Sequence, residues 1–293
     1  MPVPANVFSQ NYRVGFKSQQ VWRVPHALEF FLLGTGAALY LFSTWFARFP
    51  SGQIVAVVLV LAAGISLMLD LGRPERLWRT FANLKRSWIS RGAFSVFLFL
   101  AAAVLAFASR QSGQPRAADG FALTCEIVAS VSALVAMLYP GFVLSSYASI
   151  PSWNSPMVPL LFFIYSWTTG LAFFWLVLLF AGVAHGLGPF LGIGVFIIAF
   201  TILSLLTHLG AMAWGSVAVR ESFRLLTRGS LSGLFLGAVL GVGLVAPLLM
   251  VLWVVVTGEF IRAVVIVAAL LVLLGGFFFR YCVLRAGVYP PLF

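Results

Sequence analysis

Hydrophobic residues fill eight long runs of this chain, and polar residues gather in the short segments between them. Each run is about 20 residues long, which is the length an α-helix needs to cross about 30 Å of hydrocarbon. The runs cover residues 25–47, 53–69, 88–108, 121–147, 157–183, 189–212, 231–256 and 263–281. Because they are uniformly apolar and lack the alternation of a membrane β-barrel, they predict eight membrane-spanning helices.

The composition agrees with this pattern. The chain is 62% hydrophobic and only 9% charged, which is typical of a multi-pass membrane protein and excludes an ordinary soluble domain. We therefore predict an all-α fold, a helical bundle forming one integral membrane domain over residues 1–293. Its first half, 1–150, and its second half, 151–293, would each contribute four helices. The first run is too long for the apolar part of a cleavable signal, so we expect it to remain as the first span.

Lysine and arginine are distributed unevenly between the runs. Of the 18 such residues, about three quarters fall in segments on the same side of the membrane as the N-terminus. By the positive-inside rule, both termini are then expected in the cytoplasm, with the protein in the cytoplasmic (inner) membrane of a prokaryote. The net charge of +11 is thus a topology signal, whereas nucleic-acid binding would require a soluble basic face.

The two cysteines exclude one kind of cofactor site. Cys125 lies in the fourth run and Cys282 at the end of the eighth, at opposite depths, so a disulfide is not expected. An iron–sulfur cluster needs four protein ligands. Any such cluster must therefore belong to another subunit.

Few ionisable residues fall inside the predicted spans, and each is a functional candidate because charge is costly in hydrocarbon. Glu29, Glu126 and His208 lie within spans, and His26 lies where the first span begins. His26 and Glu29 are three residues apart and share one helix face. Two simpler interpretations stay open. In the first, the sole role of Glu29 is to stabilise the positive end of its helix. In the second, the sole role of His208 is to form an interhelical hydrogen bond.

The fourth run contains a tyrosine followed by proline and glycine, "YPG" at 139–141. Pro140 lacks an N–H and frees the carbonyl of Ala136, so we expect the helix to open locally and to line a cavity. Tyr139 and Glu29 fall in the same leaflet. A phenol, an imidazole and a carboxylate in one apolar pocket could bind and protonate the two oxygens of a quinone. The alternative is that Tyr139 only bonds the freed carbonyl.

The longest connection, "DLGRPERLWRTFANLKRSWISR" at 70–91, lies on the expected cytoplasmic side. Its apolar residues recur at helical spacing, which predicts a short interfacial helix. This segment either anchors in lipid headgroups or docks a soluble subunit. The basic residues that would then face the partner are Arg73, Arg76, Arg79, Lys85 and Arg86.

Three stretches resemble a known family. "HALEFFLLGTGAA", "YPGFVLSSYASIPSWN" and "LGRPERLW" with "SWISR" are similar to motifs of the NrfD-like family, typified by the membrane subunit of polysulfide reductase. The resemblance implies a membrane subunit of a molybdopterin oxidoreductase complex, not catalytic alone. It also implies a quinone (menaquinone or ubiquinone) bound among the first four helices, with no haem. Electrons would pass to or from a four-cluster ferredoxin-like subunit, and iron–sulfur and molybdopterin centres would lie only in partners.

Carried over by position, the resemblance assigns His26, Glu29 and Tyr139 to the quinone site, with Asp70 as a further acidic residue. Two positions depart from the polysulfide reductase pattern, which has asparagine at the position of His26 and histidine at that of Glu29. The polar roles are therefore redistributed. Because the site lies on the positive face, we expect cytoplasmic partners, which favours electron flow into quinone.

Two other classes of protein compete with this interpretation. A haem b-bearing anchor would need paired axial histidines, and only His26 and His208 lie near the same face. A small-solute or ion transporter would need matching broken helices in two halves, and only Pro247 interrupts a second span. Glu126 could separately belong to a proton path toward the outer side, or be a hydrogen-bonded residue of the bundle.

Overall fold

The computed structural model describes residues 15–70, 78, 80–81, 83–111, 117–183 and 186–290. Within these residues, eight helices are long and apolar enough to cross a membrane. This confirms the predicted all-α membrane fold. The spans are α1 (Val24–Leu41) with the π-helical η1 (Phe42–Phe46), α2 (Pro50–Asp70), α3 (Trp88–Gln111), α4 (Ala117–Ser145), α5 (Met157–Phe180), α6 (Gly188–Ala213), the π-helical η4 (Gly233–Val245) with α8 (Ala246–Thr257), and α9 (Arg262–Arg285).

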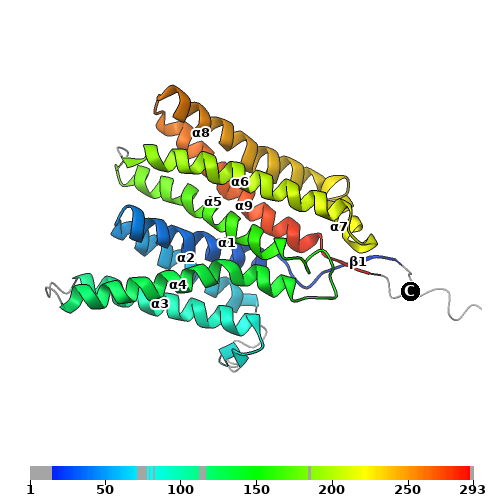
Figure 1. The fold of residues 1–293 in the computed structure, drawn as a ribbon, viewed down its shortest axis with the longest axis horizontal. Coiled ribbons are helices and arrows are strands. Elements are labelled where there is room, and N and C mark those ends of the chain that lie inside the picture. Colours follow the sequence, from blue (N-terminus) through cyan, green and yellow to red (C-terminus); the bar gives the residue numbers. More distant parts are fainter. Residues whose placement is uncertain are drawn as a thin grey trace, which may run out of the picture.

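The two ends of the chain meet at one face of the bundle. Strand β1 (Lys17–Ser18) pairs antiparallel with β2 (Val288–Tyr289). Gln19 strengthens the junction, because its side-chain nitrogen donates to the carbonyls of Trp22 and Leu284. With eight spans, both ends of the bundle's chain must lie on the same side of the membrane. We call this end, with the 146–156 loop and the short helix α7 (Val217–Thr227), the terminal face (Figure 1).

Helices α1 and α5 form the centre of the bundle. Helix α1 packs against α2 and α4 on one side and against α5 and α9 on the other. Figure 1 shows α3 and α4 at one edge of the molecule and α6 and α8 at the other. The core is therefore continuous across the boundary between the two predicted halves, and the central helices are held by both.

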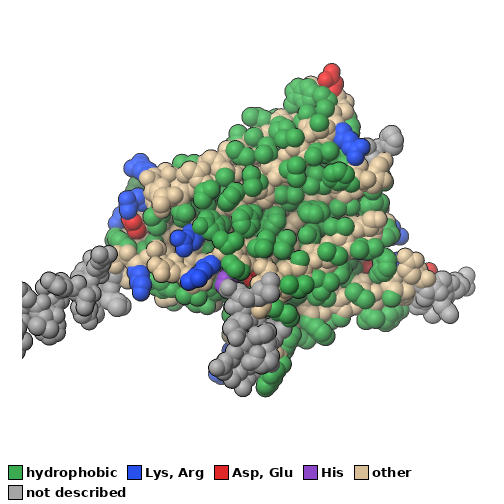
Figure 2. Space-filling view, turned by 180° about the vertical axis from the view of Figure 1, so that it is seen from behind, with side chains coloured by type: hydrophobic (Ala, Val, Ile, Leu, Met, Phe, Trp, Pro, Cys, Tyr) green, Lys and Arg blue, Asp and Glu red, His purple; other side chains and the backbone are tan. Residues whose placement is uncertain are grey.

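Most basic side chains that the structure describes lie at the terminal face, as Figure 2 shows from behind. The residues concerned are Lys17, Arg23, Lys85, Arg86, Arg91, Arg220, Arg224, Arg228 and Arg285. Arg48, Arg110 and Arg262 lie near the other ends of the helices. The charge asymmetry read from the sequence is thus an asymmetry between the two faces of the bundle.

The two prolines inside spans differ in their effect. Helix α4 runs through Pro140 without a change of helix type. In the seventh span, the π-helical η4 gives way to α8 at Ala246, directly before Pro247. A proline cannot donate the backbone hydrogen bond of a continuous helix, so this change of helix geometry accommodates it.

Candidate functional site

The first and fourth spans bring Glu29 and Tyr139 into contact. The Tyr139 hydroxyl donates a hydrogen bond to Oε1 of Glu29. Both side chains are buried, with 4% and 7% exposure. Glu29 lies five residues after the start of α1 and Tyr139 six residues before the end of α4, so both are about 8–9 Å below the terminal face. The pair is a carboxyl group and a phenol joined by a hydrogen bond within an apolar bundle.

Small and aromatic neighbours fix the Tyr139 ring. Gly92 of α3 lies against this ring, and a Cβ at that position would collide with it. The Phe30 ring meets Tyr139 edge to face, with 6.4 Å between the ring centroids. Because these contacts fix the phenol ring, its hydroxyl is held toward Glu29. The glycine and the phenylalanine therefore contribute to the site although neither carries its chemistry.

His26 lies at the rim of this site, half-buried, in the first turn of α1. Its Nδ1 is 3.5 Å from the backbone nitrogen of Arg23, and its ring centroid is 4.8 Å from that of Trp22. Trp22 in turn contacts Phe30, Tyr147 and Trp153. This aromatic cluster joins the beginning of α1 to the 146–156 loop. The sequence prediction named His26 but not Trp22. Trp22 is uncharged and is not itself a helix-breaking residue, so nothing in the sequence pattern singled it out.

A cleft of about 540 Å³ lies beside the same part of α4. It is lined by Leu138, Phe142, Ser145, Asn154, Ser155, Pro156, Pro159 and Leu160. Phe142 follows Tyr139 by three residues, so it lies about 60° around the helix from it. His26, Glu29 and Tyr139 are not among the residues that line this cleft, because it lies on a neighbouring face of α4 and the Tyr139 hydroxyl is directed toward Glu29. The shared pocket for these three side chains stays a prediction.

Much of the 70–91 connection lies outside the described residues. This applies to Arg73, Arg76 and Arg79 and to the side chain of Asp70. Lys85 and Arg86 are exposed, and Trp78 and Phe81 have 3₁₀ rather than α-helical geometry. The end of the connection is held at α4, because the Trp88 ring stacks on Phe142 with 4.3 Å between the centroids.

Glu126 lies toward the opposite face and forms an ion pair. Arg110 donates from Nε to Oε1 at 2.6 Å and from Nη2 to Oε2 at 2.9 Å. Asp119 is 3.6 Å from the same guanidinium. A two-pronged arginine–carboxylate contact of this kind gives geometric specificity as well as energy. The pair ties α3 to α4, and the role of Glu126 in a proton path stays a prediction.

The structure adds one ionisable residue that the sequence prediction overlooked. The sequence pattern groups Arg280 with Arg285, as basic residues at the end of the last span on the side of the N-terminus, but the Arg280 side chain is completely buried in the bundle. The signal that could have identified it is its position inside α9, shortly after two adjacent glycines and within the apolar stretch "GGFFFRYCVL".

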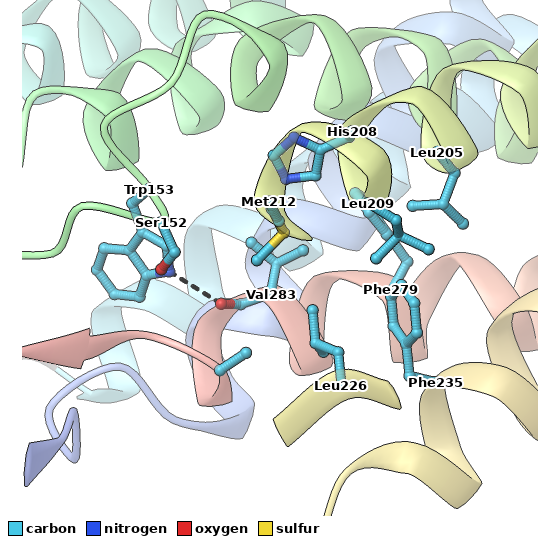
Figure 3. A pocket seen from close by; sticks show the side chains of 11 residues that line it. Ser152, Trp153, Leu205, His208, Leu209, Met212, Leu226, Phe235, Phe279 and Val283 are labelled. Atoms are coloured by element: carbon cyan, nitrogen blue, oxygen red, sulfur yellow. Dashed lines mark hydrogen bonds between the residues drawn. The ribbon is translucent and has the colours of Figure 1, made fainter. Parts of the chain in front are cut away.

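His208 is separated from the Glu29 site and lines a small cavity in the other half of the bundle (Figure 3). The cavity measures about 20 Å³ and is otherwise mostly apolar. Among the described residues, the Nδ1 atom of His208 and the Oγ atom of Ser152 have no hydrogen-bond partner. The expected interhelical hydrogen bond to His208 is therefore not made through Nδ1.

The fold defines a class, a multi-pass helical membrane protein, here with a buried carboxyl–phenol pair below one face. Comparison with known proteins narrows that class. The family model described as polysulphide reductase, NrfD, matches residues 13–290. The chain belongs to the NrfD family, and so is a membrane subunit of the polysulphide reductase type.

Two curated relatives span nearly the whole chain. The C subunit of polysulfide reductase from Wolinella succinogenes is 27% identical over 300 residues, covering 91% of this chain and 94% of its own length. The protein NrfD homolog of Haemophilus influenzae is 26% identical over 321 residues, covering 94% of this chain and 98% of its own length. Both similarities cover more than nine-tenths of the chain, so the likeness concerns most of the bundle.

Proposed function

We propose that this chain exchanges electrons between the quinone pool and an iron–sulfur partner, and that it binds quinone beside Glu29 and Tyr139. The single observation that supports this site most directly is the buried hydrogen bond from the Tyr139 hydroxyl to the Glu29 carboxyl. An ionisable residue inside a membrane span is a functional candidate by default. Here two such groups from distant segments meet at the same depth.

The chemistry of these residues suits the oxygen atoms of a quinone. On binding, the Tyr139 hydroxyl would release its hydrogen bond to Glu29 and donate to one quinone oxygen, and Glu29 can release or accept the proton that accompanies electron transfer. His26 at the rim connects the pair with the terminal face, where protons are available. A bound quinone supplies the chemistry of a lipid-soluble carrier of two electrons and two protons. The menaquinone and ubiquinone rings both offer the same two oxygens.

The terminal face is the proposed docking face for the partner subunits. It carries most of the basic side chains, so the positive-inside rule puts it, and both termini, in the cytoplasm. Lys85 and Arg86 are exposed there, next to the segment that ends on Trp88. The proposed partners are a four-cluster ferredoxin-like subunit and a molybdopterin catalytic subunit, as the family resemblance implies. With partners on this side, electrons would flow into quinone.

The Tyr139→Phe variant tests the location of the site. In the assembled complex it is expected to lower quinone-linked turnover by about 100-fold, because a positioned proton donor contributes 10²–10⁴-fold to such reactions. Reduction of an artificial dye by the partner subunits should stay unchanged, since it bypasses the membrane subunit. Both rates would be measured on purified complex of verified subunit content.

The matched control is Tyr281→Phe, which removes a hydroxyl from a half-buried tyrosine of α9. It should keep full quinone-linked turnover. Equal activity of the Tyr139→Phe complex and its parent would place the quinone site elsewhere.

A further inference from the structure

We propose that Arg280 is the positioning residue of the quinone site, holding the first turns of α1 from the other half of the bundle. The inference rests on the proposed function. Arg280 belongs to α9, five residues before that helix ends, and its exposure is 0%. Among the described side chains, no carboxylate forms a salt bridge with it. A buried cation without a counter-ion is costly, so its presence requires an explanation.

The guanidinium group connects three helices through neutral acceptors. Its Nε donates to the carbonyl of Phe30 in α1 at 3.1 Å, and its Nη1 to the carbonyl of Gly276 in α9 at 2.8 Å. Its Nη2 is 3.3 Å from the Ser166 hydroxyl of α5. The planar guanidinium presents these donors in a fixed geometry, which a flexible ammonium group cannot reproduce. Arg280 thus fixes α1 relative to both central neighbours.

The atom that Arg280 holds in α1 is next to the site. Phe30 directly follows Glu29, and its ring contacts Tyr139 at 6.4 Å and Phe162 at 5.8 Å between centroids. A hydrogen bond to the Phe30 carbonyl therefore sets the depth and rotation of the helix turn from which Glu29 reaches Tyr139. Because the donor comes from α9, the second half of the bundle positions a site built from the first.

Gly34 makes room for the guanidinium and for its acceptor. A Cβ at this position would lie 3.0 Å from Nη2 of Arg280, closer than usual, and would collide with the Ser166 hydroxyl. The local packing is thus arranged around the charged group, which argues against an arginine that is merely tolerated.

The test compares Arg280→Met and Arg280→Lys with Arg262→Met in the assembled complex. Arg262 is a matched control, since it lies on the same helix and its Nη2 donates to the Leu179 carbonyl of α5 at 2.9 Å, but near the opposite face. We expect Arg280→Met to raise the KM for a soluble quinone analogue by about 10-fold to 100-fold, because small misplacements of reacting groups have effects of that size. Arg280→Lys should give a smaller increase, and Arg262→Met none.

A purely structural role predicts a different result. It would lower the yield of complex, or lower dye-linked and quinone-linked rates together, while KM per assembled complex stayed at the parent value. That result overturns the inference, and if Arg280→Met does not assemble, the KM of Arg280→Lys decides in the same way. Parent-like turnover in Tyr139→Phe would instead overturn the proposed function, so the two failures are distinguishable.

Discussion

The Glu29→Gln variant of the assembled complex is expected to lose quinone-linked turnover by about 100-fold or more while it keeps its fold. Glutamine has the shape of glutamate, and its carbonyl oxygen can still accept the hydrogen bond from Tyr139. It cannot release or accept a proton in the physiological range. The loss would therefore report the proton chemistry of the carboxyl group and not its packing. Turnover with a quinone analogue, measured per assembled complex, checks the result.

Glu259→Gln provides the matched control for this charge change. Glu259 is exposed in the short segment between α8 and α9, near the opposite face. Its replacement should leave turnover and melting temperature at the parent values. A Glu29→Gln complex with full activity would mean that the carboxyl group only stabilises the beginning of α1, which is the simpler interpretation left open by the sequence.

The eight spans could be predicted from the sequence because the bilayer imposes a length and a polarity on each one. The predicted run 157–183 and the helix Met157–Phe180 differ only at the end, and the other boundaries agree similarly. The reason is physical, since each span must cover the same hydrocarbon thickness. Short loops contribute little ambiguity. The family resemblance then drew attention to the first and fourth spans, where Glu29 and Tyr139 meet.

What the sequence could not supply is how the spans face one another. Arg280 follows an apolar stretch near the end of the chain, and by the positive-inside pattern it was indistinguishable from Arg285, a residue of the terminal face. Only packing shows that its side chain is directed toward α1. The same holds for Glu126, whose partner Arg110 lies on the preceding helix. The depth of a residue in the membrane can be counted along its own helix. The direction in which its side chain points depends on how that helix is rotated against its neighbours.

Glycines at helix contacts also depend on how neighbouring helices pack. Replacing one of them, Gly141, is expected to have a large effect on stability. Gly141 follows Pro140 in α4, and a Cβ there would collide with the backbone of Pro159 at the beginning of α5. Backbone atoms cannot move aside as a flexible side chain can. The Gly141→Ala variant is therefore expected to destabilise the subunit by about 1–3 kcal/mol or more, as overpacking of a closely packed core does.

The control for this prediction is Gly64→Ala in α2, where no atom lies within 4 Å of the added Cβ. Alanine is favoured over glycine within a helix by about 0.5–1 kcal/mol, so this variant should be as stable as the parent or slightly more so. Thermal unfolding of the detergent-solubilised complex distinguishes the two. Gly141 follows Tyr139 by two residues, and its added Cβ would displace Pro159, which lines the cleft. Gly141→Ala should therefore also lower quinone-linked turnover at temperatures at which the complex is still folded. Parent-like unfolding and turnover would show that α4 and α5 are farther apart than the structure places them.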